Sequence, residues 1–203
     1  MSYQRRIQTK VNAEMIKIGS NIRKFSTYSC QPKTKDELKL VVYSRIVKEG
    51  SNCNLNDIDT SLIDDMSGLF YGLDFNGNIS KWNTSNVTEM INMFAFSSFN
   101  GDISEWDMSN IKRTIGMFYK NVFNQDISNW DVSNMTDMSY MFRKSDFNGD
   151  ISNWNVSNVK NMSQLFRESK FNQDISNWKI SKDCMINHMF ADCSIKEKYK
   201  PKS

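Results

Sequence analysis

The chain has 203 residues, of which 12% are aromatic and 24% charged, and its formal net charge is +3 at pH 7. This length allows one domain with an appendage or two small domains, and the aromatic content excludes wholesale disorder. The charge is unevenly distributed, because residues 1–35 hold eight basic residues and one acidic residue, whereas residues 36–195 hold fourteen and twenty-one. The distribution is therefore more informative than the total.

Neither a membrane-spanning helix nor a signal peptide is predicted. The sequence has no run of about 18 apolar residues, the length that marks a spanning helix. Its first residues, Met-Ser-Tyr-Gln-Arg-Arg-Ile, lack the apolar stretch and small-residue cleavage site of an exported precursor. We therefore expect a cytoplasmic protein, which is found at a surface or in the medium only if another export route carries it.

Residues 1–33 form a basic N-terminal segment, whose weak apolar spacing fits either an arm or a short helix. An arm of this kind would contact the phosphates of a nucleic acid. The candidate contacts are Arg5, Arg6, Lys10, Lys17, Arg23 and Lys24. The alternative is a solvated segment that helps to cover the first repeat, and the absence of base-reading motifs favours it.

A capping helix is predicted within residues 34–52. Thr34 and Glu37 form a capping box, in which the Thr hydroxyl accepts the Glu amide and the Glu carboxylate reaches back. Apolar residues then recur at helical spacing, namely Leu38, Val41, Val42 and Ile46. Gly50 supplies the stop signal. We expect this amphipathic helix to cover the exposed end of the array that follows.

Residues 53–193 repeat with a period of 24, most clearly in Phe-Asn-Gly-Asp-Ile-Ser-Asn-Trp-Asn-Val-Ser-Asn-Val at 147–159. All five tryptophans share one column, formed by Trp82, Trp106, Trp130, Trp154 and Trp178. Eleven of the 13 phenylalanines fall into two further columns. A fixed period of this size predicts a solenoid, here of about six coils, in which each coil buries its apolar face against its neighbours. A basic tail, residues 194–203, follows the array.

Apolar spacing within one coil predicts a short strand followed by a short helix. Trp154 and Val156 are two residues apart, which is the period of a strand. Val159, Met162 and Leu165 follow at helical spacing. The predicted fold class is therefore α/β, a leucine-rich-repeat-like solenoid of 24-residue coils with parallel strands and an N-terminal helical cap.

The repeat resembles the BspA-like leucine-rich repeat family of bacterial and protist proteins. The resemblance rests on Phe-Asn-Gln-Asp-Ile-Ser-Asn-Trp-Asp-Val-Ser-Asn-Met-Thr-Asp-Met-Ser-Tyr-Met-Phe at 123–142 and its copies, and it covers roughly residues 53–192. It implies a surface or secreted protein, often lipid-anchored, with a role in adhesion or partner binding. It implies no catalytic residues.

The repeated polar columns have structural interpretations. The Trp column is expected to point inward, because it shares its parity with the aliphatic position two residues later. Four carboxylates form an Asp column, Asp102, Asp126, Asp150 and Asp174, and we expect each to accept turn amides rather than to hold calcium. The neighbouring Asn column, Asn76, Asn100, Asn124, Asn148 and Asn172, is expected to form a hydrogen-bond ladder.

The residues that change from coil to coil are the candidates for partner contact. Glu105, Asp107 and Asp131 are predicted to face outward beside the Trp column and to suit a basic partner. The loops after each predicted helix are basic and suggest a stripe on another side of the array. The candidate residues of this stripe are Lys112, Arg113, Lys120, Arg143, Lys144, Arg167 and Lys170.

No catalytic or metal-binding motif is predicted. The four cysteines, Cys30, Cys53, Cys184 and Cys193, have the spacing of neither a disulfide framework nor a zinc pair. With one histidine, His188, there is little scope for nucleophile–base chemistry. We therefore expect no metal, no cofactor and no enzymatic activity.

The leading functional hypothesis is a non-enzymatic scaffold that binds a protein partner and occupies its surface, as an inhibitor or effector does. One alternative is a nucleic-acid-associated protein that uses the basic arm and the loop stripe. Another is a surface adhesin of the BspA-like type. The sequence leaves the oligomeric state open.

Overall fold

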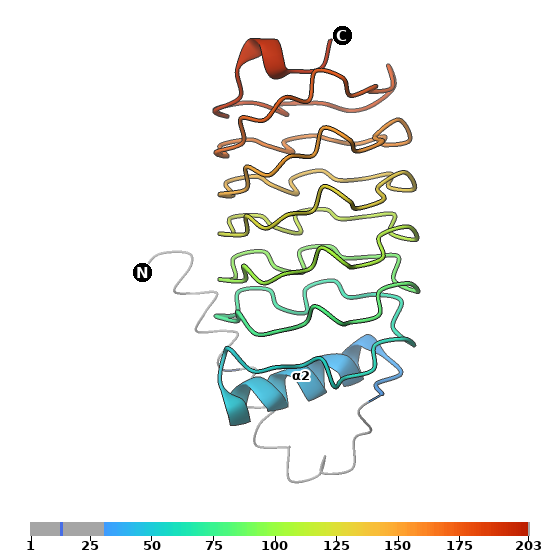
Figure 1. Cartoon of the computed structure of the whole chain (residues 1–203), viewed down its shortest axis with the longest axis vertical. Helices are drawn as coiled ribbons and strands as arrows, with labels where there is room; N and C mark the ends of the chain where they lie inside the picture. The colour runs from blue at the N-terminus through green and yellow to red at the C-terminus, as the bar shows by residue number, and fades with distance from the viewer. Residues whose placement is uncertain (1–12, 14–30, 203) are drawn as a thin grey trace.

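The computed structural model describes Ala13 and residues 31–202. Between residues 31 and 202 the chain forms helix α2 (Lys35–Glu49), a stack of coils, and the 3-10 helix η2 (Glu197–Tyr199). Figure 1 shows the coils lying one above another, with α2 beneath the first coil and η2 at the opposite end. No helix in these residues is both long and apolar enough to cross a bilayer.

Isolated parallel bridges connect successive coils. Each joins two residues that are 24 positions apart, such as Asn54 and Asn78. Five of the six bridges run through one column, which contains Asp65, Glu89, Arg113, Asp137, Asn161 and Met185. The sequence period is therefore also the period of the stack.

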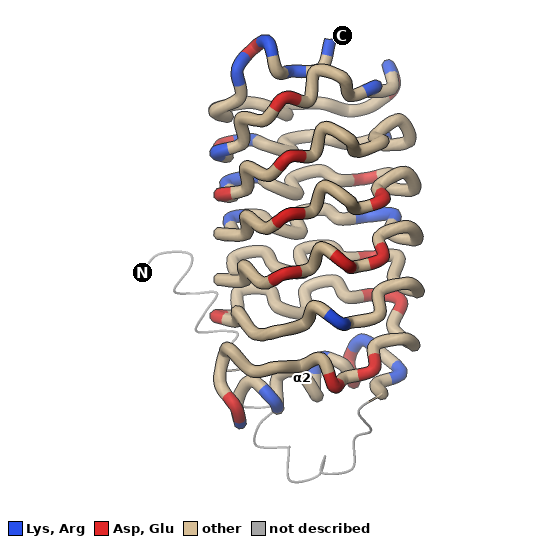
Figure 2. Tube along the Cα trace, viewed as in Figure 1, with Lys and Arg blue, Asp and Glu red and all other residues tan. Residues whose placement is uncertain are grey.

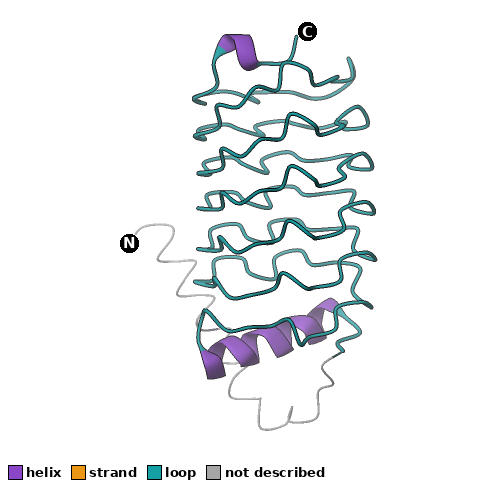
Figure 3. Cartoon of the chain, viewed as in Figure 1, coloured by secondary structure: helices purple, strands orange, loops and turns teal. Residues whose placement is uncertain are grey.

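The predicted fold class, an α/β leucine-rich-repeat-like solenoid with parallel strands, is wrong. From residue 31 to residue 202 the coils consist of turns and bends, with isolated bridges in place of a sheet. Figure 3 shows helix only at the two ends of the stack and loop throughout the coils. The apolar period predicts the stacking correctly, but it does not predict the backbone conformation within a coil.

Tight turns replace the predicted helix of each coil. The Leu165 amide donates to the Met162 carbonyl at 3.1 Å, and the Ser169 amide donates to the Phe166 carbonyl at 3.1 Å. Both hydrogen bonds span three residues, whereas an α-helix needs bonds that span four. The apolar spacing of this segment thus arises from consecutive turns that place Met162, Leu165 and Phe166 inward.

Two columns of left-handed residues explain why no helix forms. The third residue of each turn has a positive φ, for example 58° at Gln164 and 57° at Glu168. The first column contains Gly68, Asn92, Gly116, Tyr140, Gln164 and His188. The second contains Gly72, Phe96, Lys120, Lys144, Glu168 and Asp192. A left-handed residue ends an α-helix, and two such residues in every coil exclude one.

The Trp-x-Val step is too short to form a strand. The Trp154 amide donates to the Ile151 carbonyl at 3.1 Å, and the Val159 amide donates to the Val156 carbonyl at 3.0 Å. Tight turns therefore lie on both sides of this step, and they leave no run of backbone that could pair with the next coil.

Side chains supply many of the hydrogen bonds between coils. The Asn148 amide donates to Asn124 Oδ1 at 2.8 Å, and the Asn172 amide donates to Asn148 Oδ1 at 2.8 Å. These contacts confirm the predicted Asn ladder. Trp154 Nε1 donates to the Ile127 carbonyl at 3.1 Å, and each of the other tryptophans makes the same bond.

Aromatic columns fill the core. All five tryptophans are at most 4% exposed, which confirms their predicted inward orientation. Phe118 stacks on Phe142 of the next coil at 5.7 Å between ring centroids, and on Phe123 of its own coil at 4.2 Å. Because a ring of an inner coil, such as Phe118, lies between the rings of the two neighbouring coils, an end coil needs a separate cover.

Helix α2 covers the N-terminal end of the stack. It begins after Thr34, whose hydroxyl accepts the Glu37 amide at 3.2 Å, as the capping box predicts. The Gly50 amide caps the other end by donating to the Ile46 carbonyl at 2.9 Å. The helix buries Leu38, Val42, Tyr43 and Ile46.

The predicted basic tail begins a further partial coil. Ile195 is buried at the position of the Phe147 column, and the Lys196 amide donates to Asn172 Oδ1 at 3.1 Å. The Ile175 amide donates to the Tyr199 carbonyl at 3.0 Å. The tail therefore covers one side of the last complete coil.

Candidate partner-binding surface

The candidate contact residues lie on separate surfaces. Glu105, Asp107 and Asp131 are exposed beside the buried Trp column, as predicted. Lys112 and Arg113 are exposed just before the two consecutive tight turns of their coil, an arrangement that recurs in every coil and that we call the double turn. The remaining five candidates lie at or just after the left-handed turns, and we call them the basic edge: Lys120, Arg143, Lys144, Arg167 and Lys170.

Exposed carboxylates of four coils form one acidic face. Figure 2 shows Asp and Glu residues following one another from coil to coil on the side toward the viewer. The face comprises Asp102, Glu105, Asp107, Asp126, Asp131, Asp150 and Asp174, all exposed. It extends the predicted acidic set by the whole Asp column, whose members the sequence predicts only as acceptors of turn amides.

Turn amides hold the carboxylates of the Asp column. In each case one carboxylate oxygen accepts the amide two residues later, at 2.9 Å for Asp126 and 3.0 Å for Asp174. The amide and hydroxyl of Ser128 lower the pKa of Asp126 from its ordinary value, because they bond to the charged form. The turn-amide interpretation is confirmed. Among the residues that the structure describes, no three Cys, His, Asp or Glu side chains converge as metal ligands do.

Two of the three carboxylates beside the Trp column, those of Asp107 and Asp131, are held in the same way. Asp107 accepts the Ser109 amide at 2.9 Å, and Asp131 accepts the Ser133 amide at 3.0 Å. The hydroxyl and amide of Ser133 lower the pKa of Asp131. None of the seven carboxylates of the acidic face forms an ion pair with a lysine or arginine of residues 31–202. Within residues 31–202 no lysine or arginine is therefore close enough to these seven carboxylates to form an ion pair with them.

The basic edge, in contrast, carries its own counter-charges. Glu168 lies 2.9 Å from Lys144 Nζ, 3.4 Å from Arg167 Nε and 3.5 Å from Arg143 Nη2. Lys144 and Arg143 lower the pKa of Glu168, Lys144 most strongly. Lys170 Nζ pairs with an Asp146 carboxylate oxygen at 2.7 Å.

Aromatic rings also engage the basic edge. The guanidinium of Arg143 lies 5.5 Å from the centroid of the Tyr119 ring, and the ammonium of Lys120 lies 5.7 Å from that of Phe96. In a neighbouring column Arg113 pairs with Glu89 at 2.7 Å. Of the predicted basic candidates, only Lys112 has no ion pair or ring contact within residues 31–202.

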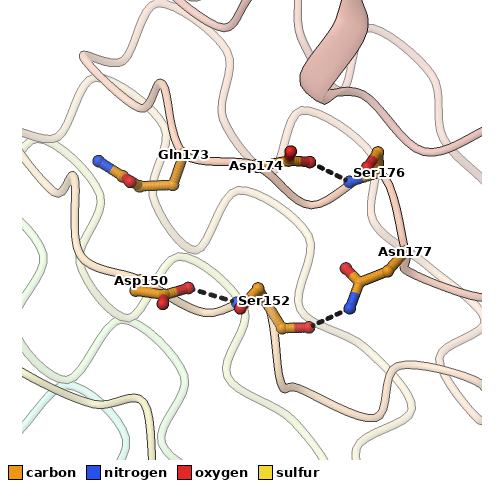
Figure 4. Close-up of a pocket in the computed structure, with 6 residues that line it drawn as sticks. All are labelled: Asp150, Ser152, Gln173, Asp174, Ser176 and Asn177. Atoms are coloured by element: carbon orange, nitrogen blue, oxygen red, sulfur yellow. Dashed lines mark hydrogen bonds between the residues drawn. The ribbon is translucent and has the colours of Figure 1, made fainter.

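Open hollows run between the coils of the acidic face. Figure 4 shows one of them, where Asp150 and Asp174 of successive coils each accept a serine amide and Asn177 donates to the Ser152 carbonyl at 3.0 Å. Its volume is ≈ 370 Å³. A similar hollow lies between Asp126 and Asp150. Each hollow exposes carboxylate and amide oxygens, which are acceptors for ammonium and guanidinium groups.

The residues proposed to contact nucleic acid lie outside the described part of the chain. They are Arg5, Arg6, Lys10, Lys17, Arg23 and Lys24.

Comparison with known proteins identifies one family. Residues 42–146 and 95–200 each match the family described as "Mycoplasma protein of unknown function, DUF285". No curated protein and no solved structure matches the chain significantly. The two matched segments overlap and together cover most of the chain.

Proposed function

This chain belongs to the family described as Mycoplasma protein of unknown function, DUF285, and we propose that it is a non-enzymatic repeat scaffold that binds a basic protein partner through its acidic face. One observation supports this proposal above the others. The exposed carboxylates of the acidic face form no ion pair within residues 31–202, whereas the basic edge is paired with Glu168, Asp146 and aromatic rings.

The physical basis of binding is charge complementarity on a stiff support. Turn amides hold six of the seven carboxylates in place, so that little side-chain freedom is lost on binding. A row of like charges increases the association rate of a cationic partner, and the increase falls with added salt. A scaffold of this kind would act by occupying its partner's surface, as an inhibitor or effector does.

Affinity capture from a lysate of the source cells tests the proposal. The bait is the full chain, and the matched variant combines Asp102→Asn, Asp107→Asn, Asp126→Asn and Asp131→Asn. Asparagine retains the turns, since Asn78 and Asn83 accept the same type of amide at 3.1 and 3.0 Å. We expect the wild type to capture a basic protein that the variant does not retain.

A control variant changes charge on a different surface. Lys112→Gln with Lys160→Gln replaces two exposed lysines that make no ion pair within residues 31–202. The control should capture the same protein as the wild type. Equal capture by wild type and Asp→Asn variant would contradict the proposal.

The resemblance of residues 123–142 to BspA-like repeats supports a second candidate, an adhesin whose partner lies on another surface. Detection of the protein by protease shaving of intact cells would favour it, and protection from protease would count against it.

A nucleic-acid partner is the remaining alternative. It would depend on basic residues 1–33, since the basic edge carries its own counter-charges. A steep loss of affinity for random duplex with rising salt would favour this alternative over a protein partner.

A further inference from the structure

The backbone hydrogen bonds of the double turn run in one direction along the stack. The amides of Met162, Gln164 and Phe166 donate to carbonyls of the next coil at 2.7, 2.9 and 3.0 Å. The Glu168 amide does the same at 2.9 Å. Earlier coils repeat this pattern, for example from Phe94 to Met117 at 2.9 Å. Every second amide of this segment thus points toward the C-terminal end of the stack.

The last coil has the same donors without acceptors. The equivalents of the four donors are the amides of Ile186, His188, Phe190 and Asp192, which we call the terminal amide row. None of these amides forms a hydrogen bond within residues 31–202, while the intervening amides still close their turns, such as Met189 to the Ile186 carbonyl at 3.0 Å.

Apolar side chains are exposed at the same place. Met185 is 52% exposed and Ile186 is 51% exposed, whereas Met162, which holds the position of Ile186 one coil earlier, is 0% exposed. The partial coil that contains Ile195 and η2 leaves Met185 and Ile186 exposed, and it reaches the last coil at Phe190, where Lys200 Nζ lies 5.6 Å from the ring centroid. At the other end of the stack, α2 lies beneath the first coil (Figure 1).

We propose that the terminal amide row is a docking edge for a polypeptide segment of the same repeat type. This segment would place alternate carbonyl oxygens on the four amides and cover Met185 and Ile186. The contacts that join coils within the chain specify this occupant, because they combine the same four amide–carbonyl bonds with burial of the column that contains Met162 and Ile186. The inference does not depend on the acidic face.

A second copy of the whole chain does not fit this edge. Two C-terminal ends that face one another would bring donors against donors, which form no hydrogen bonds. The N-terminal end of a second copy is covered by α2, which packs Leu38 and Val42 into the core. The occupant is therefore a repeat segment whose own N-terminal edge is uncovered.

The test uses the full chain and a synthetic peptide with the sequence of residues 161–170, acetylated and amidated at its ends. In the docked register, the carbonyls of Asn161, Ser163, Leu165 and Arg167 would accept from the terminal amide row. Hydrogen exchange followed by NMR should show at least about tenfold slower exchange at these four amides with saturating peptide. A scrambled peptide should produce no protection.

Two variants at Ile186 separate the contribution of the backbone amide to peptide binding from that of the side chain. Ile186→Pro removes an amide that has no partner in the folded chain, so its melting temperature should match that of the wild type. Its affinity for the peptide should fall about tenfold, while Ile186→Ala, which retains the amide, should lose less.

Three results would overturn the proposal: protection that the scrambled peptide also produces, no protection of the four amides at millimolar peptide, or unchanged affinity in Ile186→Pro. Sedimentation that shows a dimer abolished by Ile186→Pro would also contradict it, since the occupant would then be a second copy.

Discussion

At the scale of single residues, the tryptophans combine packing with a hydrogen bond. Trp154 is 4% exposed, and its indole donates to Ile127 in the preceding coil. We expect Trp154→Ala to destabilise the protein by about 3–5 kcal/mol, because it leaves a cavity and an unpaired carbonyl. Urea unfolding measures this loss. An unchanged unfolding midpoint with lost partner binding would instead place the Trp column in the binding site.

The left-handed positions require a positive φ, and this requirement is independent of side-chain contacts. Gly68 has a φ of +68°, and a Cβ built there meets nothing within 4 Å. Gly68→Ala should therefore destabilise the protein by roughly 1 kcal/mol through backbone strain alone. Gly68→Asn should lose less, because asparagine tolerates this conformation and Asn92 occupies the same column with a φ of 54°. Equal losses in both variants, measured by urea unfolding, would refute the backbone explanation.

The carboxylates of the acidic face predict a stability change in acid. The pKa values of Asp126, Asp131 and Asp174 are lowered in the folded chain by serine amides and hydroxyls. Their contribution is therefore fully present above the unfolded pKa of about 3.9 and is lost as pH falls through the folded values. Melting temperatures from pH 6 to pH 2 should fall less steeply in the triple Asp→Asn variant than in the wild type. Parallel curves would show that these bonds do not stabilise the fold.

At the scale of elements, α2 is the cover of the aromatic core. Leu38 is 0% exposed and Val47, in the same helix, is 54% exposed. We expect Leu38→Ala to cost about 2–5 kcal/mol and Val47→Ala less than about 0.5 kcal/mol. Chemical denaturation of both variants checks the difference. Similar losses in the two variants would mean that α2 does not cover the core as described.

The elements differ in how far their sequence determines them. Thr34, Glu37 and Gly50 carry local signals that specify the ends of α2 without reference to the rest of the fold. The coil segment around Met162 carries apolar spacing that suits either a helix or consecutive turns. The left-handed conformation of Gln164 decides between them, and nothing in a glutamine side chain predicts it. The glycines at 68, 72 and 116 of the same two columns were the available signal.

At the scale of the whole molecule, the 24-residue period predicts the stack and its inward tryptophans. The outward position of Glu105, Asp107 and Asp131 follows from the same alternation. The neutralisation of the basic edge could not be predicted, because it requires the approach of Arg143, Lys144 and Arg167 to Glu168 across left-handed turns. The terminal amide row could not be predicted either, because it depends on the direction of the hydrogen bonds between coils, which the turns impose.

The central claim is that the acidic face is the partner-binding surface. The most direct test is a hydrogen-exchange footprint of the full chain with its captured partner, in low salt and in 0.5 M salt. We predict protection at the amides of Ser104, Ser109, Ser128 and Ser133, which lie against the carboxylates, and its loss in high salt. Salt-independent protection, or protection confined to the basic edge, would contradict the claim.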